Sequence, residues 1–482
     1  MATYDYDIGI IGAGAAGLTV AAGAARAGAG VLIVEKEREL GGYCLHYGCV
    51  PSKTLIRTAK VYHLMRNGQH FGLPKAVIQA PDFRQIAARI RSVIDAIQRH
   101  DSEERFCSLG AKVVFGRPAF ADDHSIRLEG KSYSARSWLV STGSSAAIPP
   151  IEGLAQTPYL TNKEVFSLEE LPESMAIIGG GPIGIELAQA FTRLGTEVSV
   201  IEFLPQILSA DDPDMTDMVM EVLKAEGVEF HPGCAVERVR DLGNEREVIF
   251  TKGDEKGVVR AKTILVATGR RPNLEGLGLE ASGVAMTGKG LVLDDRLRTS
   301  RRSIYGAGDV TGTYQFTHAA GHEGAIVLSN AIFHFPRKID YRLIPWVTYT
   351  DPELASIGMN EKSAKAAGVK CSVWTEPFGT NDRSLAEGET TGKIRMLLDE
   401  KERPVGIQIL GPHAGDLLCE WVAVMNGKVR LSALASAVHP YPTLGEINKA
   451  VARNFLATKI FSEKVRKTLK LFFSLKGRAC EV

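Results

Sequence analysis

The chain has 482 residues, of which 45% are hydrophobic and 23% are charged, an ordinary composition for a globular protein. One hydrophobic core cannot serve a chain of this length, so we expect about three domains. The net charge of +1 gives no bulk attraction to nucleic acid or to a strongly acidic partner, and we expect no nucleic-acid partner.

The N-terminus carries no Lys or Arg before its first apolar stretch, so we expect no signal peptide, and the cytoplasm is the predicted location. Residues 8–25 are apolar enough to suggest a membrane span. They are, however, rich in glycine and alanine and interrupted by a phosphate-loop pattern. We therefore expect a buried strand, a turn and a helix here.

The first motif, DYDIGIIGAGAAG, leads from an apolar strand into Gly12, Gly14 and Gly17 and then into a helix. The next apolar segment, VLIVE, ends at the acidic residue Glu35. Glycines at this spacing permit a tight turn and close approach to a pyrophosphate, and a carboxylate at the end of the second strand can hold a ribose hydroxyl. The stretch therefore predicts a dinucleotide site.

A cysteine pair follows this motif, because GGYCLHYGCVPSK places Cys44 and Cys49 five residues apart. No second Cys or His pair stands out at zinc-ligand spacing, so we predict no metal site. An odd and scattered set of cysteines argues against a disulfide framework. The seven cysteines lie at positions 44, 49, 107, 234, 371, 419 and 480.

Geometry favours a reactive pair over a structural staple. A disulfide that closes so short a loop adds little stability, and cytosolic disulfides are usually catalytic. In a regular helix, Cα atoms five positions apart lie roughly 8–9 Å from each other, beyond the limit of about 7 Å for a disulfide. The segment must therefore be distorted, and Gly48 supplies the freedom. A redox pair is the preferred interpretation, with two structural free thiols as the alternative.

The glycine unit returns later in the chain. SMAIIGGGPIG carries Gly179, Gly181 and Gly184, and VSVIE ends at Glu202. Each of these four residues lies 167 positions after its counterpart in the first motif, as Gly179 does after Gly12. The sequence therefore predicts a second dinucleotide site.

Two such sites beside a cysteine pair predict an electron relay. A nicotinamide delivers a hydride and a disulfide accepts two electrons, so a flavin is the natural bridge between them. The cysteines follow the first motif, which assigns the flavin to the first site and the nicotinamide to the second. Further cofactor contacts are expected in the glycine turns after other strands and at the start of the cysteine segment; these candidates are Gly42, Thr142, Gly143, Gly269 and Asp309.

In combination, these motifs resemble the pyridine nucleotide-disulfide oxidoreductase family, which includes dihydrolipoamide dehydrogenase, glutathione reductase and mercuric reductase. The resemblance extends from residue 4 to residue 450, give or take a few positions. It implies an α/β fold of the glutathione reductase type, with two Rossmann-type dinucleotide-binding domains and a C-terminal α+β dimerisation domain. It also implies bound FAD and a homodimer.

The resemblance implies roles for residues of the cysteine segment. Cys44 would be the interchange thiol, and Cys49 would be the thiol that lies against the flavin. Lys53 would lie beside the flavin N5 atom and pair with Glu186, for which an ordinary helix ion pair is the alternative. A cation at this place would stabilise both a thiolate and the negative charge of a reduced flavin.

Two later segments would complete the flavin site. Asp309 would bind the ribityl hydroxyls. The stretch FTHAAGHEG, residues 316–324, resembles the segment of dihydrolipoamide dehydrogenase whose backbone meets the pyrimidine edge of the flavin. Thr317 and His318 are the candidate contacts in this stretch.

The acid at the end of the second motif bears on the choice of nicotinamide. Glu202 can accept hydrogen bonds from a ribose diol, and its charge repels a 2′-phosphate. Family members that use NADPH usually carry arginines just beyond this strand, whereas this chain continues as EFLPQIL. NADH is therefore the predicted donor, and NADPH is less favoured.

These assignments predict a division of the chain into four parts. The FAD-binding domain would comprise residues 1–149 and 272–342, and the NAD-binding domain residues 150–271. The dimerisation domain would comprise residues 343–457, followed by a basic amphipathic tail, residues 458–482.

The dimerisation domain carries the most informative departure from the family, in VHPYPTLGE, residues 438–446. Dihydrolipoamide dehydrogenase and glutathione reductase place a histidine five residues before the glutamate, where it crosses the dimer interface and exchanges a proton with the interchange thiol. Here that position is Tyr441, while Glu446 is retained and His439 stands two residues before the tyrosine. A phenol with a pKa near 10 is a poor proton shuttle at neutral pH, whereas an imidazole is well suited.

Mercuric reductases also carry a tyrosine at this position, but they end in an adjacent cysteine pair that collects the metal ion, and this chain ends with the single Cys480. The redox motif departs as well, with Tyr43, His46 and Tyr47 where relatives usually carry Thr, Asn and a small apolar residue. His46 is either a substitute base or a packing residue, and packing is preferred. We expect reduction by NADH to be intact and leave the acceptor open between a small or protein-borne disulfide or dithiol and a metal ion.

The tail, ATKIFSEKVRKTLKLFFSLKGRACEV, interleaves basic and apolar residues at helical spacing. Seven cations accompany a single acid, Glu463, before the terminal Glu481. Such a helix can lie on an anionic membrane or dock on a partner, and the alternative is a terminal helix that packs on its own protein. The competing functional hypothesis is thus an electron-transfer or redox-sensing flavoprotein, peripheral at the inner face of the membrane.

Overall fold

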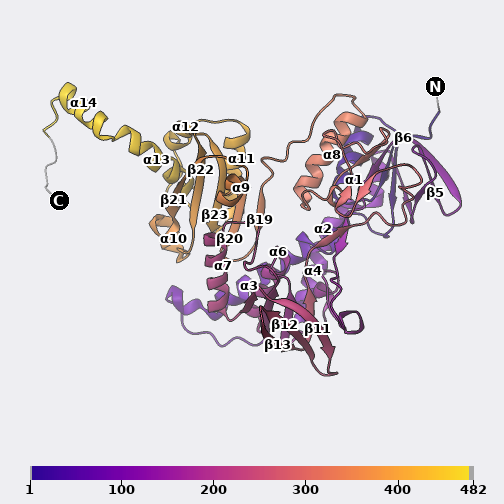
Figure 1. The fold of residues 1–482 in the computed structure, drawn as a ribbon, viewed down its shortest axis with the longest axis horizontal. Helices are drawn as coiled ribbons and strands as arrows, with labels where there is room; N and C mark the ends of the chain where they lie inside the picture. Colours follow the sequence, from indigo (N-terminus) through magenta and orange to yellow (C-terminus); the bar gives the residue numbers. More distant parts are fainter. Residues whose placement is uncertain (1–2, 477–482) are drawn as a thin grey trace. The chain divides into compact units, whose positions relative to one another are not determined.

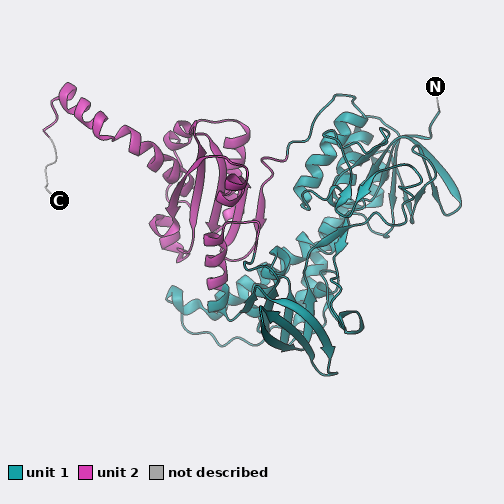
Figure 2. Cartoon of the chain, in the orientation of Figure 1, with its two compact units in different colours: residues 1–207, 223–340 teal, residues 208–222, 341–482 magenta. Residues whose placement is uncertain are grey.

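The computed structural model describes residues 3–476, and the chain folds into two compact units, which Figure 2 shows in different colours. Unit 1 comprises residues 1–207 and 223–340, and unit 2 comprises residues 208–222 and 341–482. The α/β fold with a C-terminal α+β unit is as expected. The four-part division predicted from the sequence is finer than these two units and stays a prediction.

The N-terminal sheet of unit 1 has the strand order β3-β2-β1-β6-β5-β4, with β18 paired to β6 (Figure 1). The strands β3, β2, β1, β6 and β18 run parallel, and β5 and β4 extend the sheet in antiparallel fashion. Every residue of β2 is buried, as expected for a central parallel strand. The bounds are β1 Tyr6–Ile11, β2 Val31–Glu35, β3 Ala111–Phe115, β4 Ala119–Phe120, β5 Ser125–Leu128, β6 Lys131–Val140 and β18 Ile304–Gly306.

The second glycine motif belongs to a smaller sheet of four parallel strands, in the order β10-β9-β8-β14. The strands β11, β12 and β13 form a separate antiparallel sheet, and two short pairs, β15 with β7 and β16 with β17, complete unit 1. The bounds are β7 Ser144–Ala146, β8 Ser174–Ile178, β9 Glu197–Glu202, β10 Glu229–Pro232, β11 Ala235–Asp241, β12 Arg246–Lys252, β13 Glu255–Ala261, β14 Thr263–Val266, β15 Arg270–Pro272, β16 Met286–Thr287 and β17 Gly290–Leu291.

Helices follow or connect these strands, and α1, α5 and α6 pack on the parallel sheets. The bounds are α1 Ala15–Arg26, α2 Gly42–His46, α3 Cys49–Arg66, α4 Phe83–Gln98, α5 Glu103–Ser108, α6 Pro182–Leu194, α7 Pro213–Glu226 and α8 Thr317–Ala331, with single 3-10 turns at η1 Gly68–Phe71, η2 Arg99–Asp101, η3 Leu154–Gln156, η4 Val165–Ser167 and η5 Asp309–Thr311. The apolar stretch at residues 8–25 thus forms β1 and α1, as predicted. Within residues 3–476, no helix combines the length and the apolar character needed to cross a bilayer.

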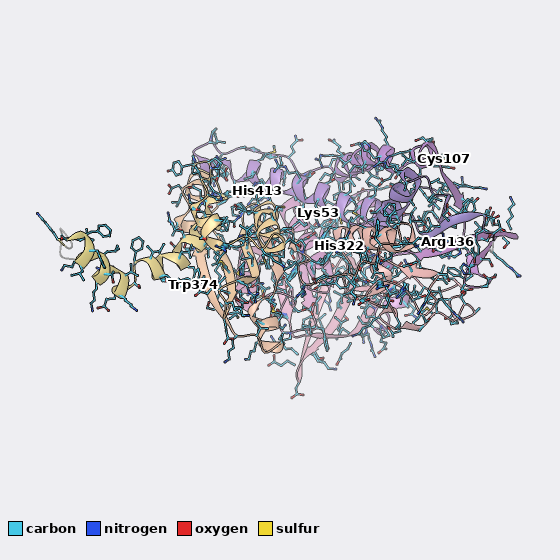
Figure 3. The ribbon with its side chains drawn as sticks, turned by 90° about the horizontal axis from the view of Figure 1, so that it is seen from above. Lys53, Cys107, Arg136, His322, Trp374 and His413 are labelled. Atoms are coloured by element: carbon cyan, nitrogen blue, oxygen red, sulfur yellow. The ribbon has the colours of Figure 1, made fainter. Side chains whose placement is uncertain are left out.

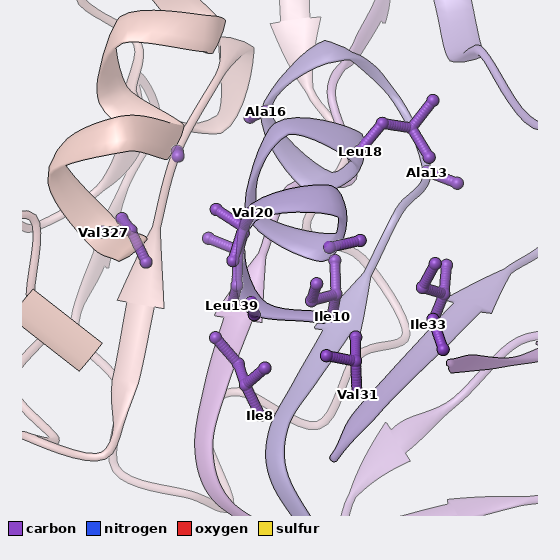
Figure 4. Packing of buried hydrophobic residues seen from close by; sticks show 14 of the residues in the cluster. Ile8, Ile10, Ala13, Ala16, Leu18, Val20, Val31, Ile33, Leu139 and Val327 are labelled. Atoms are coloured by element: carbon purple, nitrogen blue, oxygen red, sulfur yellow. The ribbon is translucent and has the colours of Figure 1, made fainter. Parts of the chain in front are cut away.

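A continuous apolar core fixes the first glycine loop in unit 1. Side chains from the parallel strands, among them Ile8, Ile10 and Ile33, pack under α1, and Val327 of α8 approaches from the other side of that helix (Figure 4). The two helices come close because small residues line their contact, and a Cβ on Gly324 would lie 2.9 Å from a backbone oxygen of α1. Burial of each large apolar side chain contributes about 1.5–3 kcal/mol, so the turn between β1 and α1 is held firmly.

Unit 2 is built on a five-stranded antiparallel sheet, in the order β19-β20-β23-β22-β21. Helices α11 and α13 pack on it around the buried Trp421. The strand bounds are β19 Trp346–Thr348, β20 Glu353–Gly358, β21 Cys371–Pro377, β22 Lys393–Asp399 and β23 Pro404–Gly411. The helix bounds are α9 Glu361–Ala366, α10 Asp382–Glu387, α11 Ala414–Asn426, α12 Leu431–Ser436, α13 Glu446–Ile460 and α14 Glu463–Phe473, with the 3-10 turn η6 at Phe378–Thr380.

Two buried carboxylates explain why residues 208–222, inside the predicted NAD-binding domain, pack with unit 2. Asp211 accepts hydrogen bonds from Trp346 and Ser356 at 3.1 and 2.8 Å. Asp212 forms an ion pair with Arg395 at 3.3 Å. Burial raises the pKa of Asp211 to about 6, and a buried carboxylate requires such donors. The segment that follows β9 is thereby fastened to the C-terminal sheet.

The third glycine of the second motif yields a prediction about stability. A Cβ on Gly184 would lie 2.1 Å from the carbonyl oxygen of Gly179, so Gly184→Ala should destabilise the fold by about 1–3 kcal/mol and lower Tm. Gly321 is a matched control, because it also lies inside a helix but a Cβ there would meet no atom closer than 3.8 Å. Gly321→Ala should leave Tm equal or higher, since alanine favours the helix. Equal losses of Tm in a thermal melt would contradict this packing argument.

Candidate active site

The two glycine motifs have the same local geometry. Gly12 and Gly179, with φ angles of +102° and +116°, adopt left-handed backbone conformations as the chain leaves its strand. A Cβ on Gly17 would lie 2.0 Å from the carbonyl oxygen of Gly12, and a Cβ on Gly184 would lie 2.1 Å from that of Gly179. The first and third glycines of both motifs are therefore required by the turn itself.

The acid that ends each second strand is bonded to the glycine loop. The backbone N–H of Ala13 donates to Glu35 over 2.7 Å, and the N–H of Gly180 donates to Glu202 over 2.5 Å. Each carboxylate also accepts a second N–H from the chain just beyond its own strand. Because Gly180 lies 167 positions after Ala13, the repeat seen in the sequence extends to individual hydrogen bonds.

The middle glycines, by contrast, face open space. No heavy atom lies within 4 Å of a Cβ placed on Gly181, and on Gly14 such an atom would meet only the Cα of Gly42, at 4.0 Å. Gly14 and Gly181 are the residues from which α1 and α6 begin. A helix N-terminus with room in front of it suits a phosphate group.

The cysteine segment starts on top of the first glycine loop. A Cβ on Gly42 would lie 2.7 Å from the Cα of Gly14, so only glycine allows this approach. The N–H of Gly41 donates to the carbonyl oxygen of Ala13 over 2.9 Å. These contacts place α2, and with it Cys44, directly beside the first dinucleotide motif.

The helix breaks between the two cysteines, as their spacing predicts. Helix α2 ends at His46, and Gly48, with φ −128° and ψ −111°, separates it from α3, which begins at Cys49. The thiols of Cys44 and Cys49 are hydrogen-bonded to each other, and both are free cysteines in the structure. The break therefore brings together two thiols that a continuous helix would hold apart.

The two thiols have opposite electrostatic environments. The hydrogen bond from Cys44 lowers the pKa of the Cys49 thiol, and the hydroxyl of Thr317, 3.4 Å away, and the charge of Lys53 act in the same direction, against the effect of burial. The same contact, together with burial, raises the pKa of the Cys44 thiol. Cys49 also begins an 18-residue helix, whose N-terminus favours an anion. The pair is therefore arranged as a thiolate at Cys49 and a protonated thiol at Cys44.

An ion pair joins the cysteine helix to the second glycine helix. Lys53 Nζ of α3 lies 2.7 Å from Glu186 Oε2 of α6, and the side chains are 34% and 6% exposed. The predicted pairing is therefore present. Cys107, also in unit 1, lies well apart from Lys53 and takes no part in this cluster (Figure 3).

A second cluster surrounds the predicted ribityl-binding acid. Asp309 accepts a hydrogen bond from Ser144 and lies 3.5 Å from Arg270 Nε in an ion pair. The Arg270 guanidinium stacks on the ring of Tyr43, 3.3 Å from its centroid. Desolvation raises the pKa of Tyr43 to about 12, so its phenol stays protonated. One buried nitrogen of Arg270, Nη1, has no hydrogen-bond partner, so a donor remains for a bound group.

The remaining predicted cofactor contacts lie in turns near these clusters. Thr142 Oγ1 donates to the carbonyl oxygen of Asn273 over 2.6 Å, and the N–H of Asn273 donates to Gly143 over 2.9 Å. Gly269, with φ +123°, has no atom within 4 Å of an added Cβ. These turns connect β6 and β14 to the strand pair that holds Arg270.

Helix α8 brings the segment FTHAAGHEG to the thiols. Its first residue, Thr317, contacts Cys49, and the ring of His318 stacks on Phe316 at a centroid distance of 5.5 Å. The fully buried Glu323 accepts the N–H of Gly308. Taken with the open glycines and the unpaired donor of Arg270, these residues fit a bound dinucleotide beside the cysteine pair.

The loop of unit 2 whose sequence departs from the family pattern, residues 438–446, exposes Tyr441 to solvent. Tyr441 is 71% exposed, and its hydroxyl donates to Asp382 over 2.8 Å, a bond that raises the pKa of the phenol. The His439 side chain is only 11% exposed, with Nε2 3.0 Å from Glu420 Oε1. Glu446 begins α13, close enough for its charge to raise the pKa of Tyr441 further. The tyrosine, not the histidine, is thus the accessible group of this loop.

The other departures in the redox motif have packing contacts. His46 Nε2 lies 2.9 Å from the carbonyl oxygen of Leu40, and its Nδ1 lies 3.8 Å from Glu39. Both ring nitrogens therefore have contacts other than Cys44, which supports the packing interpretation. The carbonyl oxygen of Tyr47 accepts a hydrogen bond from Asn162 at 3.0 Å, and this ties the helix break to the chain before β8.

Sequence reasoning missed two members of the site. Arg270 stands in ATGRRPN, which draws notice for its glycine, and nothing in the sequence shows that its guanidinium meets Tyr43 and Asp309. Ser144, whose hydroxyl donates to Asp309, belongs to no motif that the sequence shows. In residues 3–476, no three His, Cys, Asp or Glu side chains gather in a way that could hold a metal ion. Cys480 lies outside the described residues.

Comparison with known proteins identifies the family. Residues 6–324 match the pyridine nucleotide-disulphide oxidoreductase family, and residues 344–452 match the dimerisation domain of the same family. The mercuric reductase of Staphylococcus aureus is 34% identical over 453 residues, which are 94% of this chain and 82% of that protein. The dihydrolipoyl dehydrogenase of Chlamydia muridarum is 33% identical over 457 residues, 92% of this chain and 95% of that protein.

A solved structure shows the same fold. The Cu(II) complex of RclA, a HOCl-induced flavoprotein disulfide reductase from Escherichia coli, is 27% identical, with a TM-score of 0.82 over 92% of this chain and 99% of that chain. The dimerisation domain supports a homodimer. The chain therefore belongs to the pyridine nucleotide-disulphide oxidoreductase family and is a flavin-dependent, FAD-binding oxidoreductase that uses a pyridine nucleotide.

Proposed function

We propose that this enzyme passes electrons from NADH, through FAD at the first glycine motif, to the Cys44–Cys49 pair and on to an acceptor that is still to be identified, with a metal ion, as in mercuric reductase, as the alternative to a disulfide. The observation that carries the proposal is the hydrogen-bonded thiol pair on top of the first glycine loop, tied through Lys53 and Glu186 to the helix of the second. When bound, FAD would take a hydride from the nicotinamide and deliver two electrons to the disulfide.

The residues of the site have separate tasks in this proposal. Glu35 and Asp309 would hold the ribose and ribityl hydroxyls of FAD, and Gly14 would leave room for its pyrophosphate. The cation of Lys53 would stabilise the thiolate at Cys49. Reduction of the disulfide to a thiolate at Cys49 and a thiol at Cys44 consumes two electrons and one proton, which together are the hydride that NADH supplies.

The acceptor step begins from the reduced pair. The thiol of Cys44 must lose its proton before its sulfur can attack an acceptor, because the thiolate is the nucleophile. The pKa of Cys44 is raised, so this step needs a base. In the family that base is a histidine of the partner subunit. This chain has Tyr441 at that position, and the pKa of its phenol is also raised. We therefore infer that exchange with ordinary disulfides is poorly catalysed here.

The thiol pair yields a spectroscopic prediction. Reduction of the FAD-loaded enzyme by two electrons should produce a long-wavelength charge-transfer band between the Cys49 thiolate and the flavin. Cys49→Ser should abolish the band, and Cys44→Ser should show it without added reductant. The pKa of Cys49 is lowered, so the band should persist as pH falls below about 8.5, the usual thiol pKa.

The control for this experiment is Cys107→Ser, because Cys107 is an exposed cysteine of the same unit outside the site. It should leave the visible spectrum of the reduced enzyme unchanged. If Cys44→Ser and Cys49→Ser both have the spectrum of the unmodified protein, the two cysteines are not the redox pair.

The preference for NADH is proposed from the second acid. Glu202 is held by N–H groups on two sides, so it cannot readily swing away to admit a 2′-phosphate. Phe203, which follows it, is 73% exposed, and residues 203–210 contain no Lys or Arg to bind that phosphate. A fixed carboxylate in this position suits the ribose diol of NADH.

Substitution at this position gives the second prediction for the enzyme. NADH should reduce the flavin with a higher kcat/KM than NADPH. Both Glu202→Gln and Glu202→Arg should lower the ratio of kcat/KM for NADH to kcat/KM for NADPH, and the arginine should lower it more. Glu197→Arg, at the exposed start of the same strand, should leave the ratio unchanged. An unmodified enzyme with equal or higher kcat/KM for NADPH would refute the assignment.

The third prediction concerns the acceptor. Lipoamide and glutathione disulfide should be poor substrates although NADH reduces the flavin quickly, because a positioned acid-base group is typically worth about 10²–10⁴-fold. Tyr441→His should raise disulfide turnover at least about tenfold and leave flavin reduction nearly unchanged. Pro442, Thr443 and Glu446 keep the spacing of the family around a restored imidazole.

His439→Ala is the matched comparison for this prediction. The ring of His439 is paired with Glu420 inside its own subunit, so its loss should have little effect on disulfide turnover. A collapse of turnover in His439→Ala, with no gain in Tyr441→His, would mean that His439 is the acid-base residue. A panel with Hg²⁺ and quinones alongside the disulfides would identify the acceptor class.

A second candidate function is favoured by one specific feature. Helix α14 is basic, amphipathic and unburied, which suits a flavoprotein that transfers electrons or senses redox state at a membrane surface. The same NADH-dependent reduction of the thiol pair would serve it, so it differs from the first candidate only in the acceptor. Turnover that requires a lipid-borne acceptor and is absent with small disulfides would favour it.

A further inference from the structure

The last two helices have different environments. Helix α13 buries Ile447, Val451 and Phe455 against the sheet of unit 2. Helix α14 follows a break at residues 461–462, and none of its residues is buried. The match to the dimerisation domain ends at residue 452, so α14 lies beyond the part of the chain that the family uses for its fold and its dimer.

One face of α14 is apolar. Val465, Leu469 and Phe472 are spaced by four and three residues, so they share a face of the helix. Phe461 precedes this face at the break, 65% exposed, and Phe472 is 76% exposed. Phe473, beside them, is 69% exposed. Exposed aromatic side chains at both ends of an apolar helix face mark a surface that binds another apolar medium.

The remainder of the helix is strongly cationic. Lys464, Arg466, Lys467 and Lys470 lie outside the apolar face, and the single acid, Glu463, pairs with Lys467 at 2.8 Å. The tail from residue 459 onward contains seven Lys or Arg and two Glu, whereas the net charge of the whole chain is +1. The rest of the protein is therefore net acidic, and the positive charge is concentrated where the exposed aromatic side chains are.

We propose that α14 binds along the surface of an anionic phospholipid bilayer and holds the enzyme there. The apolar face would enter the acyl boundary, and the cations, whose long stems let the charge reach outward, would contact lipid phosphates. Eleven residues rise about 16 Å, half of a hydrocarbon core of about 30 Å, so the helix lies on the bilayer. A second copy of the chain fits less well, because the centres of protein interfaces are depleted in lysine.

The test uses the full-length, FAD-loaded enzyme and sedimentation with extruded vesicles. The enzyme should pellet with vesicles of mixed phosphatidylglycerol and phosphatidylcholine, and much less with pure phosphatidylcholine. Binding should weaken in 0.5 M salt because the charges are screened. Each cation near an anionic surface is worth about a fivefold change in partition, so the variant with alanine at Lys464, Arg466, Lys467 and Lys470 should bind at least about a hundredfold more weakly.

Two further variants test whether the loss of vesicle binding comes from α14 itself or from the change in the net charge of the protein. Replacement of four exposed lysines elsewhere by alanine, at Lys75, Lys131, Lys256 and Lys365, should leave vesicle binding within about twofold. The double variant Phe461→Ser, Phe472→Ser should also weaken vesicle binding, because each substitution removes apolar side-chain area that would enter the bilayer. In every variant, flavin reduction by NADH should be unchanged, which separates this inference from the proposed redox function.

Two results would overturn the proposal. Equal sedimentation with anionic and neutral vesicles, or none with either, would show that α14 has no affinity for an anionic surface. A shift from dimer to monomer in light scattering when the α14 phenylalanines are replaced would show instead that the helix covers a second copy of the chain. Retention of the dimer with loss of vesicle binding is the result that we expect.

Discussion

The ion pair between Lys53 and Glu186 connects the parts on which the rest of the site depends. It joins α3, which begins at Cys49, to α6, which begins at the second glycine loop. The Glu186 side chain is 6% exposed, so its charge requires compensation, and loss of Lys53 would remove a cation from beside a buried carboxylate. The same cation lowers the pKa of the Cys49 thiol. One interaction thus fixes the approach of two helices and supports a thiolate.

The two halves of the enzyme differ in how closely they follow their family. On the reductive side, the glycine turns and the acids bonded to them repeat one geometry at two sites in unit 1, and the cysteine pair lies beside the first of them. On the acceptor side, an exposed phenol bonded to Asp382 stands where, in the function that we propose, an imidazole would be needed to accept the proton of Cys44. Because the pKa of Cys44 is raised, our proposal places the effect of this tyrosine in the step that passes electrons to the acceptor.

Much of the fold and part of the site could be predicted from the sequence, because their determinants are local. Glycine spacing, the terminal acids and the repeat of 167 positions predict both nucleotide folds, and the five-residue cysteine spacing requires the break at Gly48. The stack of Arg270 on Tyr43 could not be predicted, since it joins residues 227 positions apart that no pattern relates. The packing of residues 208–222 with unit 2 likewise depends on buried partners distant in sequence.

Alkylation of the cysteine peptide before and after reduction tests the central claim most directly. The FAD-loaded dimer would be oxidised, divided, and treated with iodoacetamide under denaturing, anaerobic conditions with or without prior NADH. Mass spectrometry would then read the peptide that contains Cys44 and Cys49. The account predicts no alkyl group on this peptide without NADH and two after it, with Cys107 modified equally in both samples. Equal labelling of Cys44 and Cys49 in the two samples would contradict the claim that NADH reduces this pair.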